Sequence, residues 1–204
     1  MPAPPAARAE DDLLRESLER HLRASLGGPA ALAAVARQRC AYASSYDAEV
    51  VTARLRTGEE VKVFLKNLGV SHFPKDAAGQ RRDRERKVYS DLLPGAGLDT
   101  AQSYGSVWDP ERGTYWLLLE YLPGTELRFC EFEHWLAAAG WLGRAQGQFA
   151  PQADRLGGCD FLVRHDASFF RSKADLALGQ VAELYPPLAD RLARALDGYD
   201  RLIA

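Results

Sequence analysis

The fold is decided by the stretch Val61-Lys62-Val63-Phe64-Leu65-Lys66, in which the side-chain character alternates from one residue to the next. Successive side chains of a β-strand point to opposite faces of its sheet. Two sets of side chains are therefore expected, Val61, Val63 and Leu65 on one face and Lys62, Phe64 and Lys66 on the other. A half-buried ammonium is costly unless an anion meets it. Lys66 on an interior strand therefore predicts a carboxylate or phosphate partner.

The flanking sequence predicts that this strand belongs to an antiparallel sheet. Residues 50–55 are rich in β-branched side chains and form the preceding strand, and a turn at 56–59 joins the two. Two more strands are expected near 102–108 and 114–121, because Asp109-Pro110-Glu111-Arg112-Gly113 between them is a hairpin signal. The expected order is three strands, a helix and two strands, with Asn67 ending the lysine strand.

Helical patterns surround the strands. Residues 11–26 are amphipathic, with a leucine at every fourth position, and a short alanine-rich helix is expected over 30–36. A charged helix over 80–93 stands between the third and fourth strands. From residue 131 onward the apolar side chains follow the three-four spacing of helices. The fold class expected from these patterns is α+β.

The distribution of strand-like and helical patterns along the chain predicts three parts. Residues 1–10 are expected to be a disordered leader, residues 11–122 a sheet-containing lobe with its N-terminal helices, and residues 123–204 a helical part. No internal repeat is visible.

Composition narrows the class of protein. The 204 residues are 47% hydrophobic with a formal net charge of −2, which argues against a nucleic-acid partner. No apolar run approaches the roughly 20 residues that span a bilayer, so no membrane partner is expected. The three cysteines cannot all pair and form no CxxC motif, which is typical of free thiols in a reducing cytoplasm. The scattered histidines predict no metal site.

The helix after the lysine strand supplies the expected anion. Glu85 follows Lys66 by 19 residues. A strand lysine held by a helix glutamate and aimed at the phosphates of a nucleotide is the arrangement that kinases use. The alternatives are a solvated edge lysine and an incidental ion pair.

Four segments resemble, in their order and approximate spacing, the aminoglycoside phosphotransferase-like family of small-molecule kinases. They are the lysine strand (63–66), the glutamate helix (84–94), the linker between lobes (117–124) and the helix after it (141–149). The resemblance covers roughly residues 40–204. It implies a kinase-like N-terminal lobe for residues 11–122 and the helical start of a C-terminal lobe for residues 123–204, with ATP as the cofactor.

The resemblance also assigns roles to six residues. Lys66 would meet the α- and β-phosphates, Glu85 would fix Lys66, Ser44 and Ser45 would contact phosphate from a hairpin turn, and the backbone of Glu120 and Leu122 would meet the adenine edge. The alternatives are an ordinary turn at Ser44–Ser45 and a buried edge strand at the linker.

The sequence departs from the family at the catalytic loop. No H-x-D motif is present, and Asn67 is the only asparagine. Residues 188–204 resemble the helix that precedes the loop, so the chain is expected to stop before the catalytic base and the magnesium ligands. No catalytic residue is therefore assigned. ATP binding is expected to be weak, and Mg²⁺ is expected only if a second lobe is supplied.

Three interpretations follow. The chain is the nucleotide-binding part of a longer phosphotransferase, inactive alone. Alternatively, it is a non-catalytic protein, such as a pseudokinase or half of a split enzyme, that binds a partner chain or itself through the apolar face of residues 188–202. In the third, the β-rich half is a structural interaction module.

Overall fold

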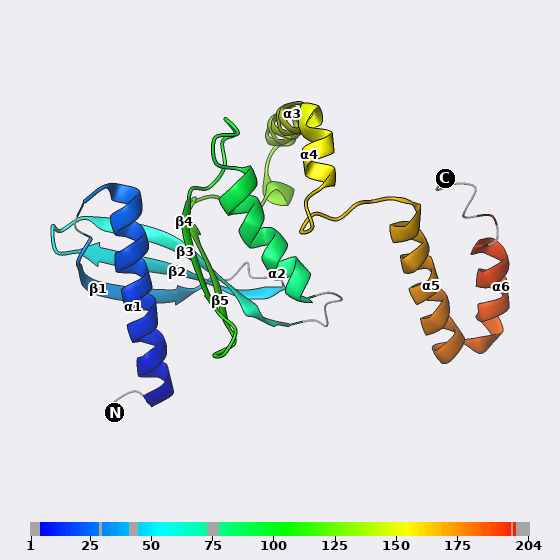
Figure 1. Ribbon diagram of the computed structural model, residues 1–204, viewed down its shortest axis with the longest axis horizontal. Coiled ribbons are helices and arrows are strands. Elements are labelled where there is room, and N and C mark those ends of the chain that lie inside the picture. The colour runs from blue at the N-terminus through cyan, green and yellow to red at the C-terminus, as the bar shows by residue number, and fades with distance from the viewer. Residues whose placement is uncertain (1–4, 29, 41–44, 73–77, 197, 199–204) are drawn as a thin grey trace. The chain divides into compact units, whose positions relative to one another are not determined.

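The computed structural model describes residues 5–28, 30–40, 45–72, 78–196 and 198. The core of the fold is a five-stranded antiparallel sheet with the strand order β1-β2-β3-β5-β4 (Figure 1). Its strands are β1 (Leu32–Arg39), β2 (Tyr46–Leu55), β3 (Glu60–Ser71), β4 (Ser103–Asp109) and β5 (Thr114–Glu120). The α+β class and the antiparallel sheet are confirmed.

Helix α1 (Pro5–Leu26) covers one face of the sheet (Figure 1). Its leucines at every fourth position, Leu14, Leu18 and Leu22, are at most 1% exposed. They pack in one core with Leu32, Val51, Ala53, Leu55, Val61, Val63, Leu65, Val107, Trp116 and Leu118. The apolar set of β3 therefore faces α1, as its alternation predicts.

Helix α2 (Ala78–Lys87) and the π-helical turn that follows it (Val88–Leu92) lie over the opposite face (Figure 1). This face carries a second core built from Leu68, Leu117 and Leu119, with Tyr46, Phe64, Tyr89, Ala101, Trp108 and Tyr115 packed against it. The helix expected over 80–93 is present, but its last turn widens. The Leu93 N–H donates to the Val88 carbonyl, five residues back.

Two expectations about the N-terminal region are wrong. Helix α1 begins at Pro5, so the stretch 5–10 of the expected leader is helical. Proline suits the first turn of a helix, where its missing N–H costs nothing. Residues 30–36 are not a second helix, because β1 spans most of them and pairs with β2. Pairing to an open sheet edge overrides the helix propensity of alanine.

The lysine strand is longer than expected. Strand β3 continues beyond Asn67 to Ser71. The Asn67 side-chain oxygen accepts a hydrogen bond from the Gly69 N–H at 3.0 Å, so the asparagine is accommodated within the strand instead of ending it.

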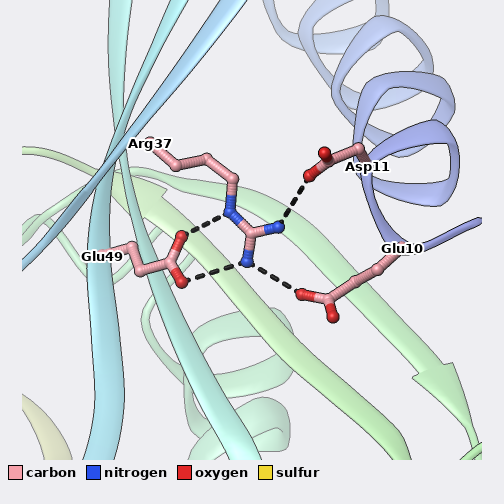
Figure 2. Close-up of polar contacts among 4 residues, drawn as sticks. All are labelled: Glu10, Asp11, Arg37 and Glu49. Atoms are coloured by element: carbon pink, nitrogen blue, oxygen red, sulfur yellow. Dashed lines mark hydrogen bonds and ion pairs between the residues drawn. The ribbon is translucent and has the colours of Figure 1, made fainter. Parts of the chain in front are cut away.

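One arginine ties α1 to the sheet. Arg37 of β1 donates to Glu49 of β2 at 2.6 and 3.0 Å, and to Asp11 and Glu10 of α1 at 2.9 and 2.8 Å (Figure 2). The hydrogen bonding of the Arg37 guanidinium to the Glu49 carboxylate is the largest of the effects that raise the pKa of Arg37. Three carboxylates around one guanidinium therefore fix the N-terminal half of α1 against β1 and β2.

A close approach holds the other half of α1. Gly105 of β4 has φ +137°, and a Cβ at this position would collide with the imidazole of His21. The Nε2 atom of His21 is buried and has no hydrogen-bond partner among the described residues. Burial lowers the pKa of His21 from its ordinary 6.5; a backbone hydrogen bond to Ser106 acts in the opposite direction, and the charge of Arg20 lowers the pKa further.

The helical part follows the sheet. The chain divides into two compact units, Met1–Pro151 and Gln152–Ala204. Helix α3 (Phe132–Phe149) belongs to the first unit, and its Trp141 Nε1–H donates to the Asp99 carbonyl at 3.0 Å. The second unit contains α4 (Ala153–Gly157), α5 (Ala167–Leu184) and α6 (Pro186–Leu196). Within the described part of the chain, no helix is long and apolar enough to cross a membrane.

Replacing Arg37 should loosen α1. We expect Arg37→Ala to lower the free energy of unfolding by about 1–2 kcal/mol, because it leaves three carboxylates without their shared cation. Asp11→Asn should lower it by less than about 0.5 kcal/mol. Urea unfolding followed by circular dichroism measures both. Arg54→Ala, which breaks an exposed pair with Glu60, is the control. An Arg37→Ala cost no larger than that of the control would contradict the role of Arg37.

Protonation of His21 should destabilise the fold. The pKa of His21 is lower in the folded state than in the unfolded state, so the unfolded state binds more protons than the folded state near pH 6.5. The free energy of unfolding therefore falls as the pH drops through that value. We expect the loss between about pH 7.5 and 5.5 to be smaller in His21→Gln than in the unmodified chain. Equal losses in the two proteins would show that other groups cause the pH dependence.

Candidate functional site

The lysine and the glutamate singled out in the sequence form an ion pair. Lys66 Nζ of β3 donates to Glu85 Oε1 of α2 at 2.6 Å. The two side chains are 28% and 29% exposed, so the pair is partly shielded and still open to a ligand. The prediction that Lys66 lies within salt-bridge reach of Glu85 is confirmed.

The surroundings of Lys66 are mostly apolar. Its neighbours in the adjacent strands are Ala48 of β2 and Leu117 of β5. Its ammonium lies 5.6 Å from the centre of the Tyr46 ring, a favourable cation–π distance. Glu85 is therefore the carboxylate that compensates the ammonium on this face of the sheet.

Two stacked arginines set the position of Glu85. The guanidinium of Arg82 lies 4.0 Å from the centre of the Tyr115 ring, and that of Arg86 lies 5.1 Å from the centre of the Trp108 ring. The two residues are opposite each other in the β4–β5 hairpin, and their rings meet edge to face with centres 4.9 Å apart. They hold the helix that carries Glu85. The sequence reading missed these contacts, although the aromatic pair flanking the hairpin turn is visible in the sequence.

A groove of about 790 Å³ opens beside the pair on the same face of the sheet. Val50, Phe64 and Leu119 stand directly opposite one another on β2, β3 and β5, and all three line the groove. Tyr89 and residues 119–126 also line it, as do residues 38–40 at the end of β1. The result is an apolar surface beside a segment of exposed backbone, typical of a small-molecule site.

The backbone at the end of β5 and directly after it borders this groove. The Glu120 N–H donates to the Gln102 carbonyl at 2.8 Å, and the Tyr121 N–H donates to the Lys62 carbonyl at 3.3 Å. The Glu120 carboxylate accepts from the Gln102 N–H at 3.1 Å, so this side chain is used within the lobe. Among the described residues, no group accepts a hydrogen bond from the Leu122 N–H. Sequence reasoning placed both Glu120 and Leu122 at a ligand, and both line the groove.

A smaller cavity of about 300 Å³ lies at the Glu85 end of the pair. Its lining residues are Tyr46, Arg81, Arg84, Glu85 and Val88. Burial, and secondarily the charge of Glu85, raise the pKa of the neighbouring Tyr89.

Only one of the two serines belongs to the part of the chain that the structure describes. Ser44 lies outside the described residues. Ser45 directly precedes β2, in the region where the hairpin was expected. Its carbonyl accepts hydrogen bonds from the Ser71 hydroxyl at 3.1 Å and from the His72 N–H at 3.0 Å, so Ser45 is held to the end of β3. Phosphate contact by either serine stays a prediction.

Comparison with known proteins assigns no family. No protein-family model matches the chain, and no curated protein matches it. The ion pair and the groove are therefore the features that bear on its function. Within the part of the chain that the structure describes, no three His, Cys, Asp or Glu side chains are grouped so that they could hold a metal ion.

A double-mutant cycle should show that Lys66 and Glu85 interact with each other. We expect Lys66→Met and Glu85→Leu each to lower the free energy of unfolding by about 1–2 kcal/mol, because each leaves one partly shielded charge without its partner. The double variant should return to within about 1 kcal/mol of the unmodified chain, because apolar residues can replace such a pair. Chemical denaturation measures all four proteins. Additive losses would mean that the two side chains do not interact.

Proposed function

We propose that this chain carries the nucleotide-binding lobe of an ATP-dependent small-molecule phosphotransferase of the aminoglycoside phosphotransferase type. The observation that supports this best is the 2.6 Å pair between Lys66 and Glu85, on the sheet face that carries the groove. Lysine on the third strand and glutamate on the following helix are the groups that kinases pair to hold phosphates. The proposal concerns nucleotide binding, and the chemical step is not assigned to any residue.

The order of groups along β3 matches a nucleotide. Phe64 and Lys66 are two residues apart on one face of an extended strand, or about 6.6 Å. A base stacked over Val50, Phe64 and Leu119 would therefore direct its phosphates toward the Lys66 ammonium. Glu85 fixes that ammonium, and the ammonium neutralises phosphate charge.

The backbone after β5 suits a purine edge. Leu122, whose N–H is a donor, lines the groove, and so does Glu120, which has a carbonyl acceptor two residues earlier. Adenine presents a donor at its exocyclic N6 and acceptors at its ring nitrogens. Backbone groups can thus recognise adenine without any specific side chain. Because the described groove walls come from this lobe, we expect a Kd on the order of 1 mM, equivalent to about 4 kcal/mol.

Nucleotide titration by NMR tests the proposal. ATP at several millimolar should shift the amides of Lys66 and Leu122 and those near Ser44 and Ser45. Lys66→Ala should weaken ATP binding most because it removes the charge facing the phosphates, and Glu85→Ala should weaken it less. Adenosine should respond little to either change.

A matched variant tests the base contact. Leu122→Pro removes the N–H donor and should weaken adenosine and ATP by a similar factor, whereas Leu122→Ala keeps the donor and should change little. If ATP at several millimolar shifts none of the amides near Lys66 and Leu122, the chain does not bind nucleotide and the proposal fails.

A second candidate is a non-catalytic partner protein. In the unit Gln152–Ala204, large apolar side chains are exposed where α5 ends and α6 begins: Leu184 at 68%, Tyr185 at 62% and Leu188 at 47%. Exposed apolar surface of this kind is typical of protein interaction sites. A chain that binds no nucleotide but self-associates or captures a partner chain through this surface would favour the second candidate.

A further inference from the structure

Helix α3 is attached to its unit along one side only. The four least exposed residues of the helix follow the three-four spacing that places them on this side; they are Ala138, Trp141, Ala145 and Phe149. The Trp141 Nε1–H donates to the Asp99 carbonyl at 3.0 Å, so this side faces the rest of the unit Met1–Pro151. The opposite side of α3 is open, and it contributes no residue to the nucleotide groove.

The open side combines large apolar side chains with glycines. Five residues at the three-four spacing lie there: Phe132, Leu136, Gly140, Gly143 and Gly147. The side chain of Phe132 is 74% exposed and that of Leu136 is 58% exposed. A Cβ at Gly143 or Gly147 would meet no atom within 4 Å outside the helix's own nearby backbone, so each glycine leaves a gap in the helix surface. Glycine within a helix is destabilising relative to alanine, and nothing packed against these two glycines compensates that cost.

The order of large and small residues makes this side complementary to a second copy of itself. Phe132 and Gly147 lie at equal distances along α3 from the position between residues 139 and 140. The same is true of Leu136 and Gly143. When two α3 helices pair antiparallel about a two-fold axis at that position, each large side chain of one copy therefore faces a glycine of the other. Large side chains that enter such gaps let the two helices approach closely.

The charges beside the open side are complementary in the same arrangement. Glu133 and Arg144 are both exposed and lie on the same flank of the open side. Within one helix they are about 16 Å apart along the axis, too far to pair with each other. In the antiparallel arrangement Glu133 of each copy is level with Arg144 of the other to within about 3 Å along the axis, and the two-fold axis brings the same flanks together. Two ion pairs between the copies are therefore expected.

We propose that α3 is a homodimerisation surface, at which a second copy of this chain binds antiparallel through Phe132, Leu136 and the glycines that face them. The inference goes beyond the nucleotide proposal and does not rest on it. The attached side of each α3 points away from the partner, so the sheets lie on the outer sides of the helix pair. Two helices about 27 Å long bury an interface at the low end of the size range of protein complexes, so we expect a Kd on the order of 10–100 µM.

Filling one of the gaps tests the proposal. Sedimentation equilibrium of the full chain from about 5 to 500 µM measures the dimer Kd. Gly143→Gln fits the single chain, because the space beside Gly143 is open, and it introduces a better helix former. In the dimer the same side chain collides with the second copy, so the Kd should rise by about tenfold or more. Gly179→Gln is the matched control, because Gly179 of α5 is equally open, and it should leave the Kd unchanged.

Charge reversal tests the antiparallel arrangement independently. Glu133→Arg and Arg144→Glu should each raise the dimer Kd about fivefold, because each brings like charges together at two places in the dimer. The variant that carries both changes should return to within about twofold of the unmodified chain, since it restores both ion pairs with their signs exchanged. Circular dichroism of each variant at equal concentration shows whether it is folded.

Three results would overturn the inference. The first is a chain that stays monomeric up to about 500 µM. The second is a dimer that a folded Gly143→Gln variant leaves intact, which would place the interface on another surface, such as the exposed apolar side chains between α5 and α6. The third is a double charge variant that dimerises no better than either single variant, which would exclude the antiparallel pairing.

Discussion

The α2 face of the sheet is organised around the pairing of one ammonium with one carboxylate across the sheet–helix boundary. Lys66 projects from the middle of β3, where the alternation that buries Val63 and Leu65 under α1 forces it onto the other face. Only an anion on an element covering that face can compensate it. Glu85 does so at 2.6 Å, and the stacking of Arg82 and Arg86 on the β4–β5 aromatic pair keeps α2 in place.

The two faces of the sheet consequently have different tasks. The α1 face is a closed core, fixed at one end by Arg37 and its three carboxylates and at the other by the imidazole of His21 against Gly105. The α2 face combines a small core with an open groove and a smaller cavity beside Glu85. A rigid closed face supporting an open one is a suitable arrangement for binding, because the scaffold holds the ligand groups in position.

Much of this could be predicted from the sequence because the signals were local. The period-two pattern of β3 predicted which side chains share a face, and the kinase arrangement of a strand lysine with a helix glutamate predicted the contact between Lys66 and Glu85. Non-local effects were missed. Residues 30–36 are alanine-rich, yet pairing with β2 makes most of them a strand. The stacked arginines and the cluster around Arg37 join segments far apart in the chain, so no pattern along the sequence indicates them.

The central claim is that the Lys66–Glu85 pair and the adjacent groove hold one nucleotide. A crystal structure of the chain with a non-hydrolysable ATP analogue tests it most directly. The account predicts the base over Val50, Phe64 and Leu119, a hydrogen bond from the Leu122 N–H to the base, and phosphate oxygens within hydrogen-bond distance of Lys66 Nζ. An analogue bound elsewhere, with Lys66 contacting only Glu85, would contradict the account.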